Sequence, residues 1–405
     1  ITPEGAVESC HHMLLNATET RVSNRTFGAF LSGGIDSSLV VALAQSVSYR
    51  PIKTFTIGFR EATYNEADYA NIAARHLGTD HVELYVSPRK AMDVIPLLPV
   101  LYDEPFADSS QIPTFLVAQL ARKHVDMVLS GDGGDEFFAG YNRYTWGRKI
   151  WNCVHDWPLC MRTALSRLFL KISPETWDSF FAIACRVLPR EFAVRNPGDK
   201  LHKLARILNS DTPEDMYYRL TSQWLDPTLI TQCSYDLSTV LTDREMWAKV
   251  DDFTDRMMYL DAVTYLPDDI LVKVNRAATG SGLEVRSPLL DYRIIEYAWQ
   301  LPLSIHMCEG KGKWLLREIL GTYIPSELID RPKTGFGVPL GDWLRGPLQD
   351  WAEALIDERR LEKEGFFKPE PIRRAWKEHL SGQCNWAYHL WSILMFQAWY
   401  EATPS

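Results

Sequence analysis

Apolar runs and helix-like stretches alternate through the first third of the chain. Short apolar runs, each closed by glycine or polar residues, predict β-strands at residues 27–31, 52–59, 81–86 and 125–129. Stretches with helical apolar spacing predict helices at residues 4–21, 37–44, 65–77, 90–101 and 111–123. Strands that alternate with helices imply an α/β fold in which helices flank a parallel sheet. Ligands of such sheets bind beyond the carboxyl ends of the strands, so the residues after each strand are the candidates for chemistry.

The pattern changes beyond residue 141. Residues 146–401 show helical periods and scattered tryptophans but no convincing alternation, which predicts a mainly helical region. We therefore expect an α/β domain over residues 1–145 and a mainly helical part over residues 146–405 that completes the substrate site. The aromatic-rich stretch at residues 386–399 is expected to be a packed terminal helix rather than a membrane or partner helix, because such helices usually close cores.

The loop after the first expected strand reads Ser32-Gly-Gly-Ile-Asp-Ser-Ser38 and leads into a helix. A glycine turn at a helix N-terminus presents unpaired backbone N–H groups to an anion, and serine hydroxyls can add donors. Asp36 would repel a phosphate unless a cation lay between them, so we interpret it as a magnesium ligand. An ordinary Gly-Gly turn is the alternative. The complete run, however, resembles the pyrophosphate loop (PP-loop) of the ATP pyrophosphatases, and the Gly-Lys-Ser/Thr of a kinase-type P-loop does not follow it.

A second loop, Ser130-Gly-Asp-Gly-Gly-Asp-Glu136, follows the fourth expected strand and contains three glycines and three acids. Clustered carboxylates repel one another, and a cation or cationic ligand would relieve that cost. Together with Asp36, Asp132 and Asp135 would form an oxygen-only site suited to magnesium bound to ATP phosphates. An acidic glycine turn without a ligand is the alternative. The interpretation requires the two loops to meet at one edge of the sheet.

Composition narrows the class of protein. The chain has 405 residues, a formal charge of −9, 46% hydrophobic and 23% charged residues, as in globular proteins with room for two domains. The acidic balance disfavours a nucleic-acid groove, and we find neither an apolar run of membrane-spanning length nor a signal-peptide pattern. Seven cysteines, an odd number without paired metal spacing, predict reduced thiols in a cytoplasmic protein.

The two loops together resemble the synthetase domain of glutamine-dependent asparagine synthetases in their bacterial form, a PP-loop fold of the adenine nucleotide alpha hydrolase-like type. Four further segments also fit that family, at residues 103–110, 265–276, 283–291 and 331–339. The resemblance covers nearly the whole chain, and its motifs are highly specific in combination.

The resemblance implies roles for individual residues. It places ATP against Leu31, Ser32, Gly33, Gly34, Asp36, Ser37, Ile57, Gly58, Ser130 and Gly131. Asp36 and Asp135 would be the magnesium ligands, and the catalytic residues would be Asp36, Asp132 and Lys333. Lys333 would contact the phosphates during adenylation, where an ammonium offsets growing negative charge. Asp132 stands where lactam-forming relatives have tyrosine, which argues against lactam formation. Asp268 or Asp269 falls near the other half of that lactam-forming pair, with an open role.

Some positions depart from the family pattern. Many relatives carry aspartate where Asn275 stands and Ser-Met where Ala278-Thr279 stands, and residues 279–282 are glycine-rich. We expect this region to help shape the substrate pocket, which weakens an inference of aspartate specificity. Glu284 and Arg286 fit either an ion pair that fixes the segment or a contact with substrate.

The beginning of the chain departs from the pattern more strongly. Glutamine-dependent members of the family begin with a glutaminase domain whose N-terminal cysteine is the nucleophile. This chain begins at Ile1, and its first thiol, Cys10, lies inside an expected helix. The N-terminal glutaminase domain is therefore expected to be absent from this chain, and Cys10 is expected to be a buried packing residue.

The resemblance implies an ATP-dependent carbon–nitrogen ligase that forms AMP and pyrophosphate. A carboxylate, with the aspartate β-carboxylate as first candidate, would be adenylated, and ammonia would displace AMP to give the amide. One alternative is an amidotransferase acting on another acid of a natural-product or surface-polysaccharide pathway. A tRNA-modifying PP-loop enzyme is disfavoured by the lack of a basic patch and of Cys-X-X-Cys. A scaffold that binds ATP without catalysis is disfavoured by the intact Asp36, Asp132, Asp135 and Lys333.

The expected cofactors are ATP and Mg²⁺, and the expected partners are a small-molecule carboxylate and ammonia. A glutaminase domain or subunit is a further candidate partner, whereas nucleic acid and membrane are not expected. The oligomeric state stays open, with a homodimer as one candidate.

Overall fold

The computed structural model describes residues 2–22, 26–59, 66–184, 197–233, 238–330 and 337–403. The chain forms two compact units. The first comprises Ile1–Glu104, Asp108–Thr145 and Trp247–Val338, and the second comprises Pro105–Ala107, Trp146–Met246 and Pro339–Ser405. Residues 247–338, which the sequence division at residue 145 assigns to the helical part, thus belong to the unit that contains the sheet.

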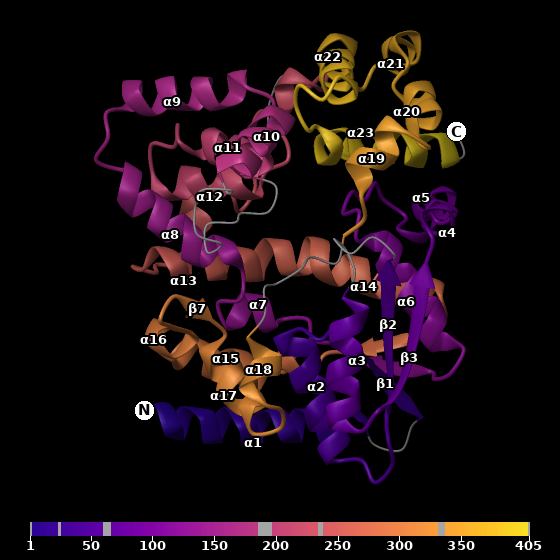
Figure 1. Ribbon diagram of the computed structural model, residues 1–405, viewed down its shortest axis with the longest axis vertical. Coiled ribbons are helices and arrows are strands. Elements are labelled where there is room, and N and C mark those ends of the chain that lie inside the picture. The colour runs from indigo at the N-terminus through magenta and orange to yellow at the C-terminus, as the bar shows by residue number, and fades with distance from the viewer. Residues whose placement is uncertain are drawn as a thin grey trace. The chain divides into compact units, whose positions relative to one another are not determined.

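A five-stranded parallel sheet organises the first unit (Figure 1). Its strands are β1 (Phe27–Phe30), β2 (Lys53–Phe59), β3 (Asp80–Val86), β4 (Met127–Leu129) and β5 (Glu284–Arg286), in the order β3-β2-β1-β4-β5. The first four match the predicted strands, and the α/β prediction with a parallel sheet is confirmed. The strand order reverses between β1 and β4, and such a switch point is where open α/β sheets bind ligands.

The predicted strands did not include β5. It has three residues, Glu284, Val285 and Arg286, of which two are charged, so no apolar run marks it. The strand forms because it pairs in parallel with β4, with Val285 opposite Val128. This pairing brings a segment from late in the chain to the edge of the sheet beside β4.

Helices surround the sheet in the first unit. They are α1 (Pro3–Val22), α2 (Ile35–Ser46), α3 (Ala67–Leu77), α4 (Pro88–Met92), α5 (Leu98–Leu101), α6 (Gln111–Arg122), α7 (Gly134–Phe137), α13 (Phe253–Leu260), α14 (Val272–Gly280), α15 (Tyr292–Gln300), α16 (Leu303–His306), α17 (Trp314–Gly321) and α18 (Ser326–Ile329). A π-helix, η5 (Asp261–Leu271), joins α13 to α14, and a short antiparallel hairpin, β6 (Met307–Cys308) and β7 (Lys311–Gly312), precedes α17.

The core of this unit lies around α2. Leu43 of α2, Leu14 of α1 and Leu315 of α17 are fully buried and belong to one apolar cluster. The predicted helix over residues 4–21 is confirmed as α1, and Cys10 is buried within it. Because α2 is buried on nearly every side, its first turn is held firmly at the carboxyl end of β1.

One predicted helix is wrong in detail. Residues 90–101 do not form a continuous helix but are divided among α4, a 3₁₀ turn (Ile95–Leu97) and α5. Pro96 and Pro99 explain the breaks, because each lacks the N–H that an α-helix requires and clashes with the preceding turn. The other predicted helices of the α/β part are present within a few residues of their expected ends.

The second unit is helical. Its helices are α8 (Asn142–Val154, which begins in the first unit), α9 (Leu159–Lys171), α10 (Pro174–Ala184), α11 (Pro197–Ile207), α12 (Pro213–Thr221), α19 (Leu340–Arg345), α20 (Gln349–Leu355), α21 (Glu358–Glu364), α22 (Pro369–Leu380) and α23 (Ala387–Ala402). The aromatic-rich α23 packs against α19, α20 and α22 and buries Trp391, as predicted for a terminal core helix. Across the described ranges, every helix is too short or too polar to cross a membrane.

Candidate active site

The two glycine-containing loops meet where β1 and β4 end side by side. A Cβ atom on Gly131 would lie 2.9 Å from both the Asp36 Cβ and the Ser37 backbone nitrogen. A Cβ on Gly134 would lie 2.5 Å from the Asp36 carboxylate. Only glycine therefore permits this approach, and the predicted meeting of the loops is observed.

The first loop is arranged by its own serines. The Ser32 and Ser37 hydroxyls lie 3.0 Å apart, and the backbone N–H groups of Ser32 and Gly34 donate to the Ser37 and Ser32 hydroxyls. Gly33 has a φ of +71°, and a side chain there would strike the backbone of α3. The loop thus folds tightly onto the N-terminus of α2, which begins at Ile35, with its donors close together.

A buried lysine joins the two acidic loops. The Lys313 ammonium forms an ion pair with Asp36 and lies 2.7 Å from the Asp135 carboxylate, and its side chain is only 7% exposed. Burial opposes its charge, but the Asp135 and Asp36 carboxylates outweigh burial and raise the pKa of Lys313. One cation therefore holds together two carboxylates that would otherwise repel each other.

The sequence analysis missed Lys313, because the features that mark this residue come from the fold and not from a sequence pattern. Lys313 is the N-cap of α17 with a φ of +60°, and a positive charge is unfavourable beside the N-terminus of a helix. Its backbone N–H donates to the Phe138 carbonyl, and a Cβ on Gly140 would lie 1.9 Å from its side chain. Non-glycine residues with a positive φ are uncommon. The positive charge of Lys313 at a helix N-terminus is unfavourable unless an anion lies nearby.

Asp132 lies between this ion pair and a second charged cluster. The Ser130 hydroxyl donates to its carboxylate, and the Ser287 hydroxyl, just beyond β5, donates to its backbone carbonyl. Burial raises the pKa of the Asp132 carboxyl, with contributions from Asp36 and Asp135, while Ser130 and Lys273 oppose the shift. Charged groups of both clusters therefore affect the ionisation of Asp132.

The second cluster contains Asp108, Asp269 and Lys273. The Lys273 ammonium at the start of α14 lies 2.6 Å from the Asp108 carboxylate, which also accepts from the backbone N–H and hydroxyl of Ser110. Burial and the nearby Asp108 carboxylate raise the pKa of Asp269 to about 7. Asp269 rather than the exposed Asp268 therefore belongs to the charged cluster beside Asp132.

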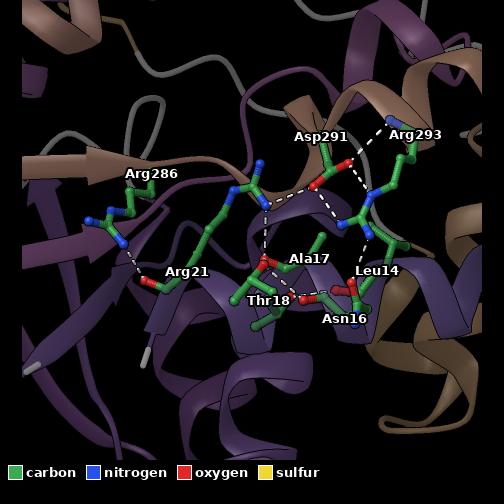
Figure 2. Close-up of polar contacts among 9 residues, drawn as sticks. Leu14, Asn16, Ala17, Thr18, Arg21, Arg286, Asp291 and Arg293 are labelled. Atoms are coloured by element: carbon green, nitrogen blue, oxygen red, sulfur yellow. Dashed lines mark hydrogen bonds and ion pairs between the residues drawn. The ribbon is translucent and has the colours of Figure 1, made fainter. Parts of the chain in front are cut away.

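Glu284 and Arg286 form an ion pair with an N–O distance of 2.6 Å. Arg286 also donates to the backbone carbonyl of Arg21 at the end of α1, as Figure 2 shows. The Arg286 carbonyl in turn accepts from the Ser130 N–H. The sequence left open an ion pair that fixes the segment or a contact with substrate. These contacts support the ion pair, which fixes the segment beside the acidic loop.

A network around Asp291 secures the same segment to α1. Arg21 of α1 and Arg293 of α15 both donate to the Asp291 carboxylate at distances near 3.0 Å, and Arg293 also donates to Asn16 (Figure 2). Asp291 caps α15 by accepting from the Arg293 backbone N–H. The hydrogen bonds from these arginines hold the pKa of the Asp291 carboxyl well below its usual range.

Asp291→Asn is therefore expected to lower the free energy of unfolding by about 2 kcal/mol at pH 7. Because the pKa of Asp291 is depressed in the folded state, this stabilisation is present above the unfolded pKa and is lost as the pH falls below about 4. Urea denaturation measures both effects. Asp126→Asn, which removes a carboxylate 74% exposed in its pair with Arg122, is the control and should change stability by less than about 0.5 kcal/mol. Equal effects of the two substitutions would contradict this role of Asp291.

The residues expected near adenine occupy two adjacent strand ends. Leu31 follows β1, is 1% exposed, and donates its backbone N–H to the Phe55 carbonyl of β2. Ile57 and Gly58 lie in the last half of β2, and both are buried. Their backbone thus lies along the same edge of the sheet as the first loop, while their contact with a nucleotide stays a prediction.

Lys333 lies outside the described residues. Asp330, the last described residue before it, forms ion pairs with Lys311 and Arg317, which flank Lys313 in sequence. These ion pairs hold Asp330 beside β7 and α17, the elements on either side of Lys313.

The glycine-rich departure at residues 279–282 has a packing explanation. A Cβ on Gly280 would lie 2.2 Å from the Leu101 side chain, and Ala277 and Ala278 are fully or nearly fully buried. Small residues therefore let α14 pack closely on its neighbours. Asn275 is exposed.

The residues present fit a magnesium–nucleotide complex better than a metal ion held by protein alone. In the part of the chain that the structure describes, no group of three or more His, Cys, Asp or Glu side chains is arranged to hold a metal ion. Mg²⁺ commonly takes only one or two carboxylates and completes its shell with phosphate oxygens and water. Asp36 and Asp135, joined through Lys313, match that arrangement.

Sequence comparisons with known proteins show which family this chain resembles. The family model described as asparagine synthase matches residues 10–401. A glutamine-hydrolysing asparagine synthetase of Bacillus subtilis is 27% identical over 385 residues, which cover 92% of this chain and 56% of the relative. A putative glutamine-hydrolysing asparagine synthetase of Mycobacterium bovis is 32% identical over 93% of this chain and 54% of its own length. The human glutamine-hydrolysing asparagine synthetase is 23% identical over 96% of this chain and 54% of its own length.

The chain spans about half the length of the curated relatives it matches. The matched part contains both glycine loops, the sheet and both charged clusters. The chain belongs to the asparagine synthase family.

Proposed function

We propose that this chain is an ATP-dependent ligase that adenylates a carboxylate, releases pyrophosphate, and forms an amide when ammonia displaces AMP. The observation that carries the proposal is the meeting of the two loops at the β1–β4 switch point, with Asp36 and Asp135 joined through Lys313. Family membership supports the same chemistry.

Each part of the site has a task in this reaction. The first loop offers the Ser32 and Ser37 hydroxyls and the N-terminus of α2 to the phosphates. Asp36 and Asp135 would hold the magnesium ion, which would offset the charge on the phosphates as pyrophosphate leaves. Lys313 orients both carboxylates and adds a positive charge beside the leaving group. The same task is proposed for Lys333, on the resemblance alone.

We propose aspartate, through its β-carboxylate, as the acceptor. A zwitterionic amino acid needs a cation for its carboxylate and an anion for its ammonium group. Lys273 and Asp269 supply this pair of charges beside Asp132, in the same unit as the phosphate loop.

We propose that ammonia reaches the site from a glutaminase domain or subunit. The names of the relatives describe glutamine-hydrolysing enzymes, and the chain covers about half of their length. A glutaminase domain or subunit would therefore deliver ammonia to the candidate active site of this chain.

A pyrophosphate-release screen tests the proposal. The chain is incubated with ATP and Mg²⁺, with candidate acids supplied singly, and with ammonia or glutamine as nitrogen donor. Release is expected with aspartate and ammonia, and little with glutamine. Release driven only by another acid would favour the alternative amidotransferase, and the absence of acid-dependent release would contradict the ligase assignment.

Asp269 gives a pH dependence that can be checked. Burial and Asp108 raise its pKa to about 7, so the protonated form is favoured in the folded state and stability falls as the pH rises from about 4 to 7. Between pH 4 and pH 8, wild-type protein should lose up to about 4 kcal/mol more stability than Asp269→Asn. Acceptor binding should improve as Asp269 ionises.

The measurement combines urea denaturation with the pH profile of pyrophosphate release. Asp268→Asn changes the exposed neighbour and should reproduce the wild-type profile. An unchanged profile in Asp269→Asn would remove Asp269 from the acceptor site.

A further inference from the structure

Arg143 lies in an unusual aromatic setting at the start of α8. Its guanidinium carbon is 3.9 Å from the centre of the Tyr141 ring and 5.0 Å from that of Tyr265. The same group makes a two-point ion pair with Asp261, at 2.7 and 2.9 Å. The guanidinium is planar, so it can stack on aromatic rings and pair with both oxygens of a carboxylate, which the lysine ammonium cannot do.

Asp261 is completely buried and is the first residue of the π-helix η5. Besides Arg143, the Tyr144 hydroxyl donates to it. Because a buried carboxylate requires compensation, this arrangement fixes the start of η5 to the start of α8.

The contact joins two segments of the candidate site. Tyr141 lies at the end of the acidic loop region, and its hydroxyl donates to Glu136. Tyr265 belongs to η5, which also carries Asp269 and leads directly into Lys273 of α14. Arg143 therefore touches a residue of each segment at once.

The contact matters for the conformation of η5, because η5 is a π-helix. η5 contains Pro267, which cannot donate to a helical ladder and would clash with the carbonyl of Val263 in an α-helix. π-Helical turns are rare and are frequent at functional sites. We therefore expect tertiary contacts to help fix η5, which carries Asp269 and leads into α14 with Lys273.

We propose that Arg143 is a positioning residue that holds η5 against the acidic loop and thereby sets the geometry with which Asp269 and Lys273 meet the acceptor acid. The proposal rests on the proposed ligase function. It assigns to Arg143 an effect on the acceptor and not on the nucleotide, since its contacts are with η5, Tyr141 and Tyr144 and not with the Ser32–Ser37 loop.

The test compares Arg143→Met and Arg143→Lys with wild type in acid-dependent pyrophosphate release, varying the acceptor and ATP separately. Arg143→Met should raise the acceptor KM at least about tenfold and leave the ATP KM within about twofold. Arg143→Lys, which keeps a charge for Asp261 but loses the planar stack, should give an intermediate acceptor KM. Arg122→Met, at an exposed ion pair on α6, is the matched control and should match wild type.

The outcomes separate the two proposals. An inactive wild-type chain would overturn the ligase function together with this inference. An active wild type whose Arg143 variants change both KM values equally, or neither, would overturn the inference alone. If Arg143→Met does not fold, Arg143→Lys decides: a selective rise in acceptor KM supports the inference, and wild-type values contradict it.

Discussion

Asp36→Asn is expected to reduce acid-dependent pyrophosphate release by about 1,000-fold, because it removes one of the two proposed magnesium ligands at the centre of the phosphate site. The asparagine side chain keeps the shape of Asp36 but not its charge. Folding should be affected little, since Lys313 retains its 2.7 Å ion pair with Asp135. Pyrophosphate release and thermal unfolding of the variant distinguish these two effects.

Asp80→Asn serves as the matched control for that experiment. Asp80 is an exposed carboxylate at the start of β3, the end of the strand opposite to the phosphate loop, where it pairs with Lys53. Its substitution should leave pyrophosphate release unchanged. Wild-type rates in Asp36→Asn would show that this carboxylate takes no part in adenylation.

Lys313→Met is expected to have the second large effect, and to act on stability as well as on catalysis. Removal of the buried ammonium leaves the Asp36 and Asp135 carboxylates close together without compensation. In metal-free buffer the loss of stability should be about 3–5 kcal/mol. Pyrophosphate release should fall strongly, because the two carboxylates lose the group that orients them.

Magnesium provides the diagnostic readout for this variant. Mg²⁺ should raise the melting temperature of Lys313→Met more than that of wild type, because the ion can replace the missing charge between the carboxylates. Lys311→Met, at an exposed lysine two residues earlier, should show neither effect. A Lys313→Met protein as stable as wild type without magnesium, and no more responsive to it, would contradict the role given to this lysine.

The parts of the fold that the sequence predicts are those with local signals. The apolar runs around Ala29 and Phe55 mark buried parallel strands, and the glycine loops mark their carboxyl ends. Alternation does not reveal β5, because a charged three-residue segment becomes a strand only by pairing with β4. The helix at residues 90–101 is overpredicted because apolar composition outweighed Pro96 and Pro99.

The candidate site divides in the same way. Asp36, Asp132 and Asp135 lie in the loops and first helical turns that follow β1 and β4, so sequence order alone places them at one sheet edge. Lys313 and Lys273 belong to segments far along the chain from the acids that they contact. Their ion pairs with Asp135 and Asp108 depend on tertiary packing, which a short sequence pattern does not reveal.

The most direct test of the account follows oxygen from the acceptor. Aspartate labelled with ¹⁸O in its β-carboxylate is incubated with the chain, ATP, Mg²⁺ and ammonia, and the nucleotide product is analysed by mass spectrometry. If the carboxylate attacks the α-phosphorus and ammonia then displaces AMP, one labelled oxygen appears in AMP for each amide formed. Formation of ADP, or of AMP without label, would contradict the central claim that these two loops support adenylation of a carboxylate.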